Sequence, residues 1–172
     1  MEMRTIYLAG GCYWGVEKYI SNIAGVVETE VGFANGHVEA PAYVQVKKGD
    51  TGHAETVRVA YDADVLSPET LLRLFFRTID PTSFEKQGED VGNQYRTGVY
   101  WTEAADAPVV CGELERLQAQ YAAPLAVEAC GLESFYPAEE YHQKYLDKTP
   151  GGYCHVPWEA IEWVKTADLS DI

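Results

Sequence analysis

The sequence predicts an α+β fold in a single domain that spans residues 1–172. Strand-like and helix-like segments follow one another without the strict strand–helix–strand rhythm of a parallel sheet. The 172 residues are 47% hydrophobic and contain no repeat, low-complexity stretch or linker. A chain of this length can bury one sizeable core, so we expect one folded unit.

The first half of the chain predicts three strands and two helices. Short hydrophobic or alternating runs predict strands at residues 5–9, 26–33 and 55–61. Hydrophobic residues at helical spacing predict a helix over 14–23. Ser67 and Pro68 predict the N-cap and the first turn of a second helix, which ends near Thr78. Residues 34–53 are rich in Gly, Asn, Pro and Asp, and we expect a long ordered loop there.

The second half predicts two more strands and two more helices. The strands are expected at 97–101 and 125–129. Helices are expected from about 104 to 121 and from Pro137 to about 147. Residues 80–96 indicate an irregular stretch, and 149–155 indicate a glycine-rich turn.

The charge balance argues against two classes of partner. The chain has 13 basic and 27 acidic residues, which give a net charge of −14. Such a surface repels phosphate groups, so we expect neither nucleic acid nor an anionic membrane as a partner. No run approaches the roughly 20 apolar residues of a membrane span, and the apolar run near the start is too short for a secretion signal. These features predict a cytoplasmic protein.

The cysteines and histidines do not predict a metal site. The cysteines are Cys12, Cys111, Cys130 and Cys154, and the histidines are His37, His53, His142 and His155. No two cysteines form a CxxC pair, and the histidines do not repeat at a ligand spacing.

Cys12 is the candidate nucleophile. It follows a strand, Gly10 and Gly11, and it stands where a helix is expected to begin. The positive end of a helix dipole stabilises a thiolate, so this position predicts a lowered thiol pKa. Tyr13 and Trp14 follow directly and could wall a pocket for an apolar group attached to an electrophile.

From GGCYWGVE onward, the chain resembles the peptide methionine sulfoxide reductases of the A type. Matching strings continue in order over most of the chain: GVVETEVGFANG, PAYVQV, TGHAETVRVAYD, LFFRTIDPTS, QGEDVGNQYRTGVY, FYPAEEYHQKYL and GYCH. The resemblance implies a two-layer α+β sandwich with a ferredoxin-like core, a small mixed sheet and long ordered loops. It also implies reduction of the S epimer of methionine sulfoxide, in peptides and as the free amino acid.

The same resemblance implies roles for individual residues. Cys12 attacks the sulfur, and Glu55 protonates the departing oxygen, which requires burial to raise the pKa of that carboxyl. Tyr43 and Tyr95 donate hydrogen bonds to the oxygen, and Asp90 fixes the backbone of the substrate. Tyr13 and Trp14 hold the substrate methyl group. Tyr13 stands where the family more often has phenylalanine, and it is expected to place a hydroxyl at the pocket rim.

A second thiol must then resolve the sulfenic acid that forms on Cys12. Cys154 is the candidate, because Gly151 and Gly152 allow its backbone to move inward. We expect Cys111 and Cys130 to be structural. No cysteine follows Cys154, so thioredoxin is expected to reduce a Cys12–Cys154 disulfide directly, in a monomer without a resident cofactor.

Two other functions fit the residues themselves. One is a cysteine hydrolase in which His53, His142 or His155 activates Cys12. The other is a redox-responsive binding module, in which a Cys12–Cys154 bond changes a surface. Only the reductase turns over methionine sulfoxide with a dithiol.

Overall fold

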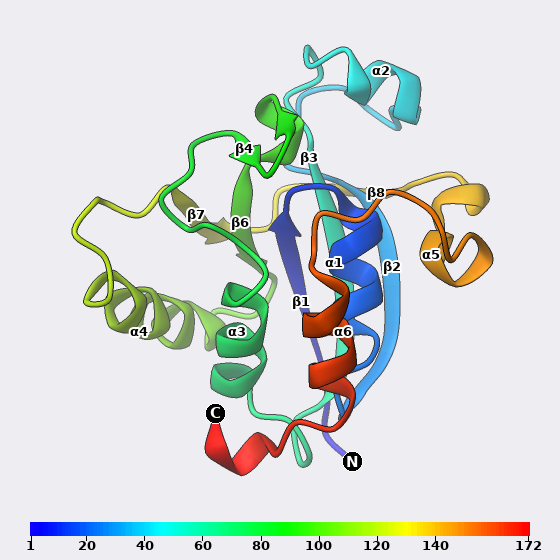
Figure 1. The fold of residues 1–172 in the computed structure, drawn as a ribbon. Helices are drawn as coiled ribbons and strands as arrows, with labels where there is room; N and C mark the ends of the chain where they lie inside the picture. The colour runs from blue at the N-terminus through cyan, green and yellow to red at the C-terminus, as the bar shows by residue number, and fades with distance from the viewer.

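The centre of the fold is a six-stranded mixed sheet with the order β7-β6-β1-β3-β2-β8 (Figure 1). The computed structural model describes all residues from Met1 to Ile172. The strands are β1 Met3–Gly10, β2 Val26–Ala34, β3 Ala54–Asp62, β6 Thr97–Trp101, β7 Val127–Gly131 and β8 Phe135–Pro137. Only β6 and β7 pair in parallel, and the other neighbours are antiparallel.

The predicted α+β class and the ferredoxin-like core are confirmed. The core elements follow one another as β1, helix α1 (Tyr13–Ile20), β2, β3, helix α3 (Pro68–Phe76) and β6. This is a strand–helix–strand–strand–helix–strand order, and its four strands lie side by side as β6-β1-β3-β2.

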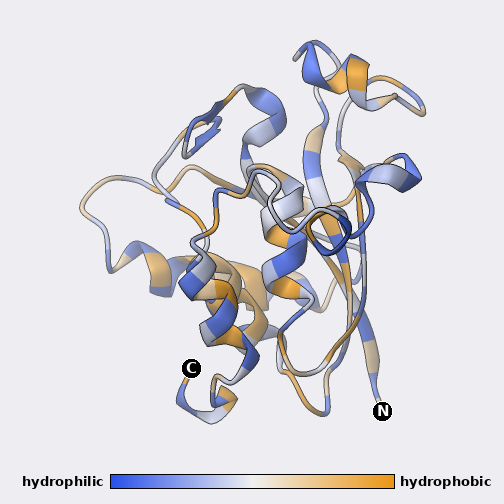
Figure 2. Cartoon of the chain, turned by 45° about the vertical axis from the view of Figure 1, so that its right-hand side comes forward, coloured by the Kyte–Doolittle hydropathy of each residue, from blue (hydrophilic) through white to orange (hydrophobic).

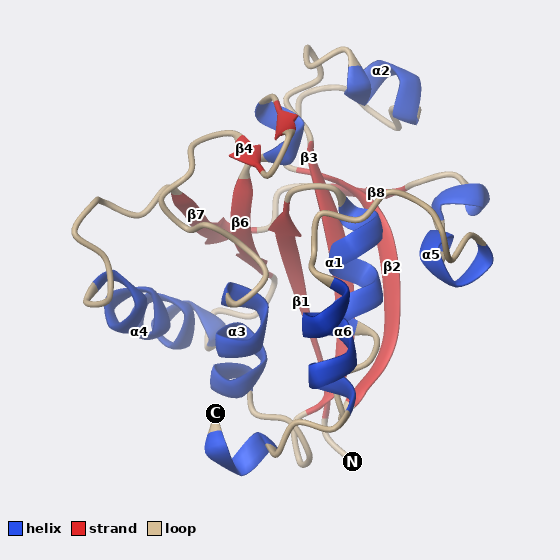
Figure 3. Ribbon diagram, in the orientation of Figure 1, coloured by secondary structure: helices blue, strands red, loops and turns tan.

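Helices cover one face of the sheet. In Figure 3, α1, α3 and helix α6 (Trp158–Lys165) lie in front of the strands. Helix α4 (Asp106–Gln118) packs beside α3, where Arg73 pairs with both carboxylate oxygens of Glu113 at 2.8 Å. A cluster of 26 buried hydrophobic residues fills the space between these helices and the sheet. The helices alternate hydrophilic and hydrophobic turns in Figure 2, as expected for helices that bury one side.

Helix α3 begins as predicted. The side-chain oxygen of Ser67 accepts the Thr70 backbone N–H at 3.1 Å, and Pro68 occupies the first turn. The buried face of α3 consists of Leu71, Leu72, Leu74, Phe75 and Phe76. Local signals therefore place this helix correctly.

The predicted helix over 137–147 is wrong. The segment holds the end of β8, a 3₁₀ turn at Glu140–His142 and a short helix α5 at Tyr145–Lys148. Gln143 uses its side-chain amide to bond the backbone N–H and carbonyl of Val31, both at 2.9 Å. Lys144 has a left-handed φ of 54°, which breaks the helix. Contacts with β2 therefore outweigh the local helical pattern.

Three further elements lie where the sequence indicated loops or no element. Helix α2 (Tyr43–Lys47) interrupts the 34–53 loop, and a hairpin of β4 (Lys86–Gln87) and β5 (Asp90–Val91) lies within 80–96. Helix α6 was not predicted at all. None of the helices combines the length and the apolar character that crossing a membrane requires.

The loops that carry the candidate residues gather at one end of the sheet. Figure 1 shows α2, the β4–β5 hairpin and α5 around the end of the molecule at which α1 begins, while both termini lie at the opposite end.

Candidate active site

Cys12 is the N-cap residue of α1, directly after β1. Gly11 makes the turn between them with a φ of +87°. A Cβ atom at Gly11 would lie 2.7 Å from the Cβ of Gln87, so a side chain has no room there. The predicted placement of Cys12 at a helix start is confirmed.

The predicted lowering of the Cys12 pKa is wrong. The side chain is only 7% exposed, and this burial raises the pKa of the thiol well above its ordinary value. The charge of Glu55 adds to the increase, while the backbone N–H of Trp14 opposes it. Desolvation therefore outweighs the helix N-terminus, and Cys12 rests as a thiol at neutral pH.

Glu55 lies beside this cysteine, in β3. Its carboxyl is 1% exposed, and Oε1 accepts the backbone N–H of Tyr13 at 3.3 Å. Oε2 has no hydrogen-bond partner. Burial raises the pKa of Glu55 to about 8, the charge of Asp90 adds to this, and the Tyr13 N–H opposes it. Glu55 therefore keeps its proton at neutral pH, as an acid must.

Two phenols share the surroundings of Glu55. Tyr43 begins α2, and Tyr95 ends a 3₁₀ turn at Asn93–Tyr95. Burial and the charge of Glu55 raise the pKa of Tyr43 to about 12, and they raise the pKa of Tyr95 as well. Both hydroxyls consequently remain protonated donors. Strand β3, helix α2 and the 3₁₀ turn, which are distant in the chain, thus bring these groups to one site.

Asp90 lies in β5, and its charge raises the pKa of Cys12, Glu55 and both phenols. Its Oδ2 accepts the hydroxyl of Tyr153 at 2.8 Å. This bond joins the β4–β5 hairpin to the segment that carries Cys154.

The two aromatic residues after Cys12 differ in exposure. Tyr13 is only 1% exposed, and its ring packs against Phe33 and His142 with centroid distances of 5.9 and 5.6 Å. Its hydroxyl is buried without a partner, so the predicted position at the pocket rim is wrong. Trp14 is partly buried and stacks on Tyr145 at 3.8 Å.

Cys154 is half-buried against the first turn of α1. Its thiol donates to the Val156 carbonyl at 3.2 Å. A Cβ atom at Gly15 would lie 2.9 Å from the Cys154 sulfur, so this glycine lets the segment dock. The charge of Cys154 also bears on the Cys12 pKa, which indicates that the two thiols are neighbours.

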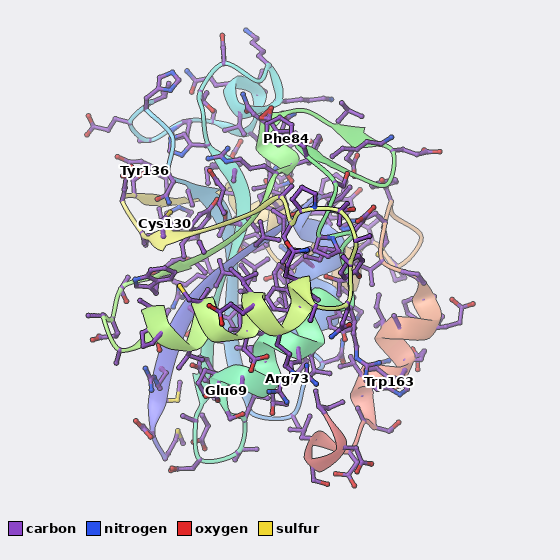
Figure 4. All side chains as sticks on the ribbon, turned by 90° about the vertical axis from the view of Figure 1, so that its left-hand side faces the viewer. Glu69, Arg73, Phe84, Cys130, Tyr136 and Trp163 are labelled. Carbon is purple, nitrogen blue, oxygen red and sulfur yellow. The ribbon has the colours of Figure 1, made fainter.

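The other two cysteines are exposed. Cys111 lies on α4, and Figure 4 shows Cys130 on the edge strand β7. A structural cysteine usually lies in the hydrophobic core. Neither of these two cysteines does. Across the whole chain, no group of three or more His, Cys, Asp and Glu side chains is placed to hold a metal ion.

Comparison with known proteins agrees with this geometry. Residues 4–169 match the family described as peptide methionine sulfoxide reductase. The chain belongs to this family. MsrA of Lachnoclostridium phytofermentans is 52% identical over 164 residues, which cover 95% of this chain and 99% of that relative.

Solved structures of the family share the fold. The reduced form of Mxr1 from Saccharomyces cerevisiae has a TM-score of 0.85 and 37% identity, and the match covers 89% of each chain. Mxr1 has also been solved in complex with Trx2, with a TM-score of 0.60 and 24% identity over 84% of this chain. The protein is thus a methionine sulfoxide reductase, an oxidoreductase with the fold of Mxr1.

The histidine contacts of this reductase do not support the hydrolase alternative. His53 uses both ring nitrogens on backbone groups, those of Gly36 and Val38. His142 accepts the Trp14 indole N–H at 3.0 Å, and His155 contacts the Gly10 carbonyl at 2.9 Å. A cysteine hydrolase requires an imidazole that bonds its nucleophilic sulfur. No imidazole bonds the Cys12 sulfur.

Several residues that support the candidate site were not predicted from sequence. His142 and Tyr145 hold the Trp14 indole, Tyr153 bonds Asp90, and Glu139 accepts the Tyr43 backbone N–H at 3.3 Å. All four lie in the last third of the chain, near or within the matching strings FYPAEEYHQKYL and GYCH. The density of aromatic residues in those strings is the signal that could have found them.

Proposed function

We propose that this reductase acts on the S epimer of methionine sulfoxide, in peptides and as the free amino acid. The pair formed by Cys12 and Glu55 carries the proposal, because a buried carboxyl that holds its proton lies beside a candidate nucleophile. Sulfoxide reduction needs both groups, since the oxygen leaves the sulfur only when it is protonated.

In the first step, Glu55 donates its proton to the sulfoxide oxygen while the Cys12 sulfur attacks the sulfoxide sulfur. The resulting carboxylate then lies beside the thiol and can accept its proton. The Tyr43 and Tyr95 hydroxyls donate hydrogen bonds to the same oxygen and stabilise the developing charge. The bond formed between the two sulfurs then breaks as the hydroxyl group moves from the substrate sulfur to the Cys12 sulfur. The products are methionine and a sulfenic acid on Cys12.

The remaining candidates hold the substrate. Asp90 fixes the substrate backbone at the mouth of the site. Tyr13 and Trp14 face the methyl group, which carries partial positive charge beside an oxidised sulfur. Aromatic rings attract such a group.

In the second half of the cycle, Cys154 attacks the sulfenic acid and forms a Cys12–Cys154 disulfide. Thioredoxin then reduces that disulfide, as the complex of the yeast relative Mxr1 with Trx2 suggests. We propose that residues 1–172 form one catalytic domain, which works in the cytoplasm as a monomer and needs no resident cofactor.

A dithiothreitol assay with separated epimers tests the reaction. The S epimer of a methionine sulfoxide peptide is expected to yield methionine, and the R epimer is expected to yield none. The measurement is methionine released per enzyme over time. Equal rates with the two epimers, or no release from either, would contradict the proposal.

Cys154→Ser tests the second half of the cycle. The variant is expected to make about one methionine per enzyme without reductant, because Cys154 acts only after methionine has left. Turnover with thioredoxin should fail, because thioredoxin would have to attack a buried sulfenic acid instead of a disulfide. The measurements are methionine per enzyme and free thiols per enzyme, with and without thioredoxin.

Cys111→Ser is the matched control, because it removes an exposed thiol on α4. It should keep full thioredoxin-driven turnover. Wild-type turnover by Cys154→Ser would instead assign the resolving role to Cys111 or Cys130.

A further inference from the structure

His155 is a partly buried histidine to which the proposed cycle gives no role. It follows Cys154, and its Nε2 lies 2.9 Å from the Gly10 carbonyl oxygen. A carbonyl oxygen can only accept a hydrogen bond, so Nε2 carries the proton and Nδ1 keeps a lone pair. Nδ1 is buried and has no hydrogen-bond partner. The ring therefore presents an unused proton acceptor.

This acceptor lies beside the Cys154 sulfur. A Cβ atom at Gly15 would lie 2.9 Å from the Cys154 sulfur and 3.4 Å from His155 Nδ1. Both atoms thus flank one small space over the first turn of α1. The Cys154 thiol donates to the Val156 carbonyl and makes no hydrogen bond to Nδ1, so a proton would pass between them through a bridging water.

The segment from Tyr153 to His155 is held in place by contacts on two sides. The Tyr153 hydroxyl bonds Asp90 at 2.8 Å, and His155 bonds the end of β1. The backbone before this segment contains the flexible residues Gly151 and Gly152. The resting position of Cys154 is therefore set by the two hydrogen bonds of Tyr153 and His155. A fixed imidazole beside a thiol is the arrangement that general-base activation requires.

The protonation states suit such a transfer. Burial raises the pKa of Cys154, so its sulfur rests as a thiol and must lose a proton to attack. Burial lowers the pKa of His155, which keeps the ring neutral and able to accept. Asp90 is the charged group whose field reaches the ring, and it partly offsets that decrease.

We propose that His155 is the general base of the resolving step, with Nδ1 taking the Cys154 proton as that sulfur attacks the Cys12 sulfenic acid. The S–S bond forms and the S–O bond of the sulfenic acid breaks. The oxygen leaves as water with its own hydrogen and the proton passed from Cys154. Cys12 sulfur is reduced and Cys154 sulfur is oxidised, so no outside oxidant or reductant takes part. The inference rests on the proposed role of Cys154.

His155→Gln is the first test. The glutamine amide can donate to the Gly10 carbonyl as Nε2 does, but it offers no basic nitrogen. After mixing with the S epimer and no reductant, methionine should form in the wild-type burst. Loss of the two thiols should slow on the order of 10²-fold, and sulfenic acid on Cys12 should accumulate and be trapped by dimedone. His37→Gln removes an exposed imidazole and should change neither rate.

His155→Ala with added imidazole is the second test. An open pocket of about 280 Å³ borders Cys154 and His155, and Leu146, Trp158 and Ile161 also line it. Its size admits imidazole, so the added base should restore disulfide formation in His155→Ala and should not accelerate His155→Gln. The wild-type rate should rise with pH on the acidic side, as His155 loses its proton, whereas in both variants the rise should move to alkaline pH, where the Cys154 thiol ionises without a base.

The outcomes separate this inference from the proposed function. Disulfide formation at the wild-type rate in His155→Gln, or no rescue by imidazole, would overturn the role of His155. A methionine burst that falls together with disulfide formation would also overturn it, because the histidine would then be structural. A wild-type enzyme that makes methionine but closes no Cys12–Cys154 disulfide would contradict the proposed cycle instead.

Discussion

Cys12→Ser is expected to abolish reduction of methionine sulfoxide, with dithiothreitol and with thioredoxin alike. A serine hydroxyl is a far weaker nucleophile toward sulfur and cannot form a disulfide. The position at the N-cap of α1, beside the Glu55 carboxyl, leaves no other sulfur in the same place. The measurement is methionine formed per enzyme, over a time in which the wild-type enzyme completes many turnovers, against a no-enzyme blank.

The loss should be chemical and not structural. Serine is only slightly smaller than cysteine and is a preferred N-cap residue. The melting temperature should therefore change only slightly. Cys130→Ser removes an exposed thiol on β7 and should keep the wild-type rate. Methionine above the blank from folded Cys12→Ser would remove Cys12 from its role.

Glu55→Gln should slow the reductive step on the order of 10²–10⁴-fold, the usual cost of losing a positioned acid. Glutamine keeps the shape and a hydrogen-bond donor but has no transferable proton, so the substrate should still bind. The measurement is the single-turnover rate of methionine formation at saturating substrate. A wild-type single-turnover rate would mean that the acid lies elsewhere.

The same variant should change the pH profile. In the proposed mechanism Glu55 acts in its protonated form, and burial raises its pKa to about 8. The wild-type rate should therefore decline as pH rises through about 8, because the acid is lost. The Cys12 thiol, whose pKa lies well above its ordinary value, should by itself favour higher pH. The rate of Glu55→Gln should consequently rise with pH and show no decline near pH 8. A decline that persists in this variant would have to come from another group.

Glu113→Gln is the matched control for the loss of a buried carboxyl. Glu113 is buried on α4 and pairs with Arg73, and its charge is not among those that shift the pKa of Cys12 or Glu55. Its substitution should lower the melting temperature, since it leaves a partly buried arginine without its partner. The rate per folded enzyme should not change. Glu55→Gln should show the opposite pattern, because the Glu55 carboxyl is neutral at pH 7.

Much of the architecture could be predicted because its signals are local. A short hydrophobic run and two alternating runs placed the three strands of the first half, and Ser67 with Pro68 placed the start of α3. Gly10 and Gly11 before Cys12 placed the candidate nucleophile at a helix start. These patterns depend on residues a few positions apart, and tertiary contacts reinforce them.

The segment from 137 to 147 shows where local signals fail. Its hydrophobic spacing is helical, but Gln143 bonds β2 and the backbone N–H of Lys144 bonds Glu17 at 2.8 Å. Both partners are more than 100 residues away in the chain. Since hydrogen bonds to buried partners outweigh weak helix propensity, the segment turns instead of continuing as a helix.

The sequence by itself determined the fold class, the family and the identity of Cys12, Glu55, Tyr43, Tyr95, Asp90 and Cys154 as candidates. The tertiary structure alone decided the protonation of the site. Burial raises the pKa of Cys12 where the helix start predicted a decrease, and it raises the pKa of Glu55 to about 8. It also buries the Tyr13 hydroxyl and leaves His155 Nδ1 free beside Cys154. The reason is that desolvation depends on every atom packed around a group, and those atoms come from loops that no local pattern connects.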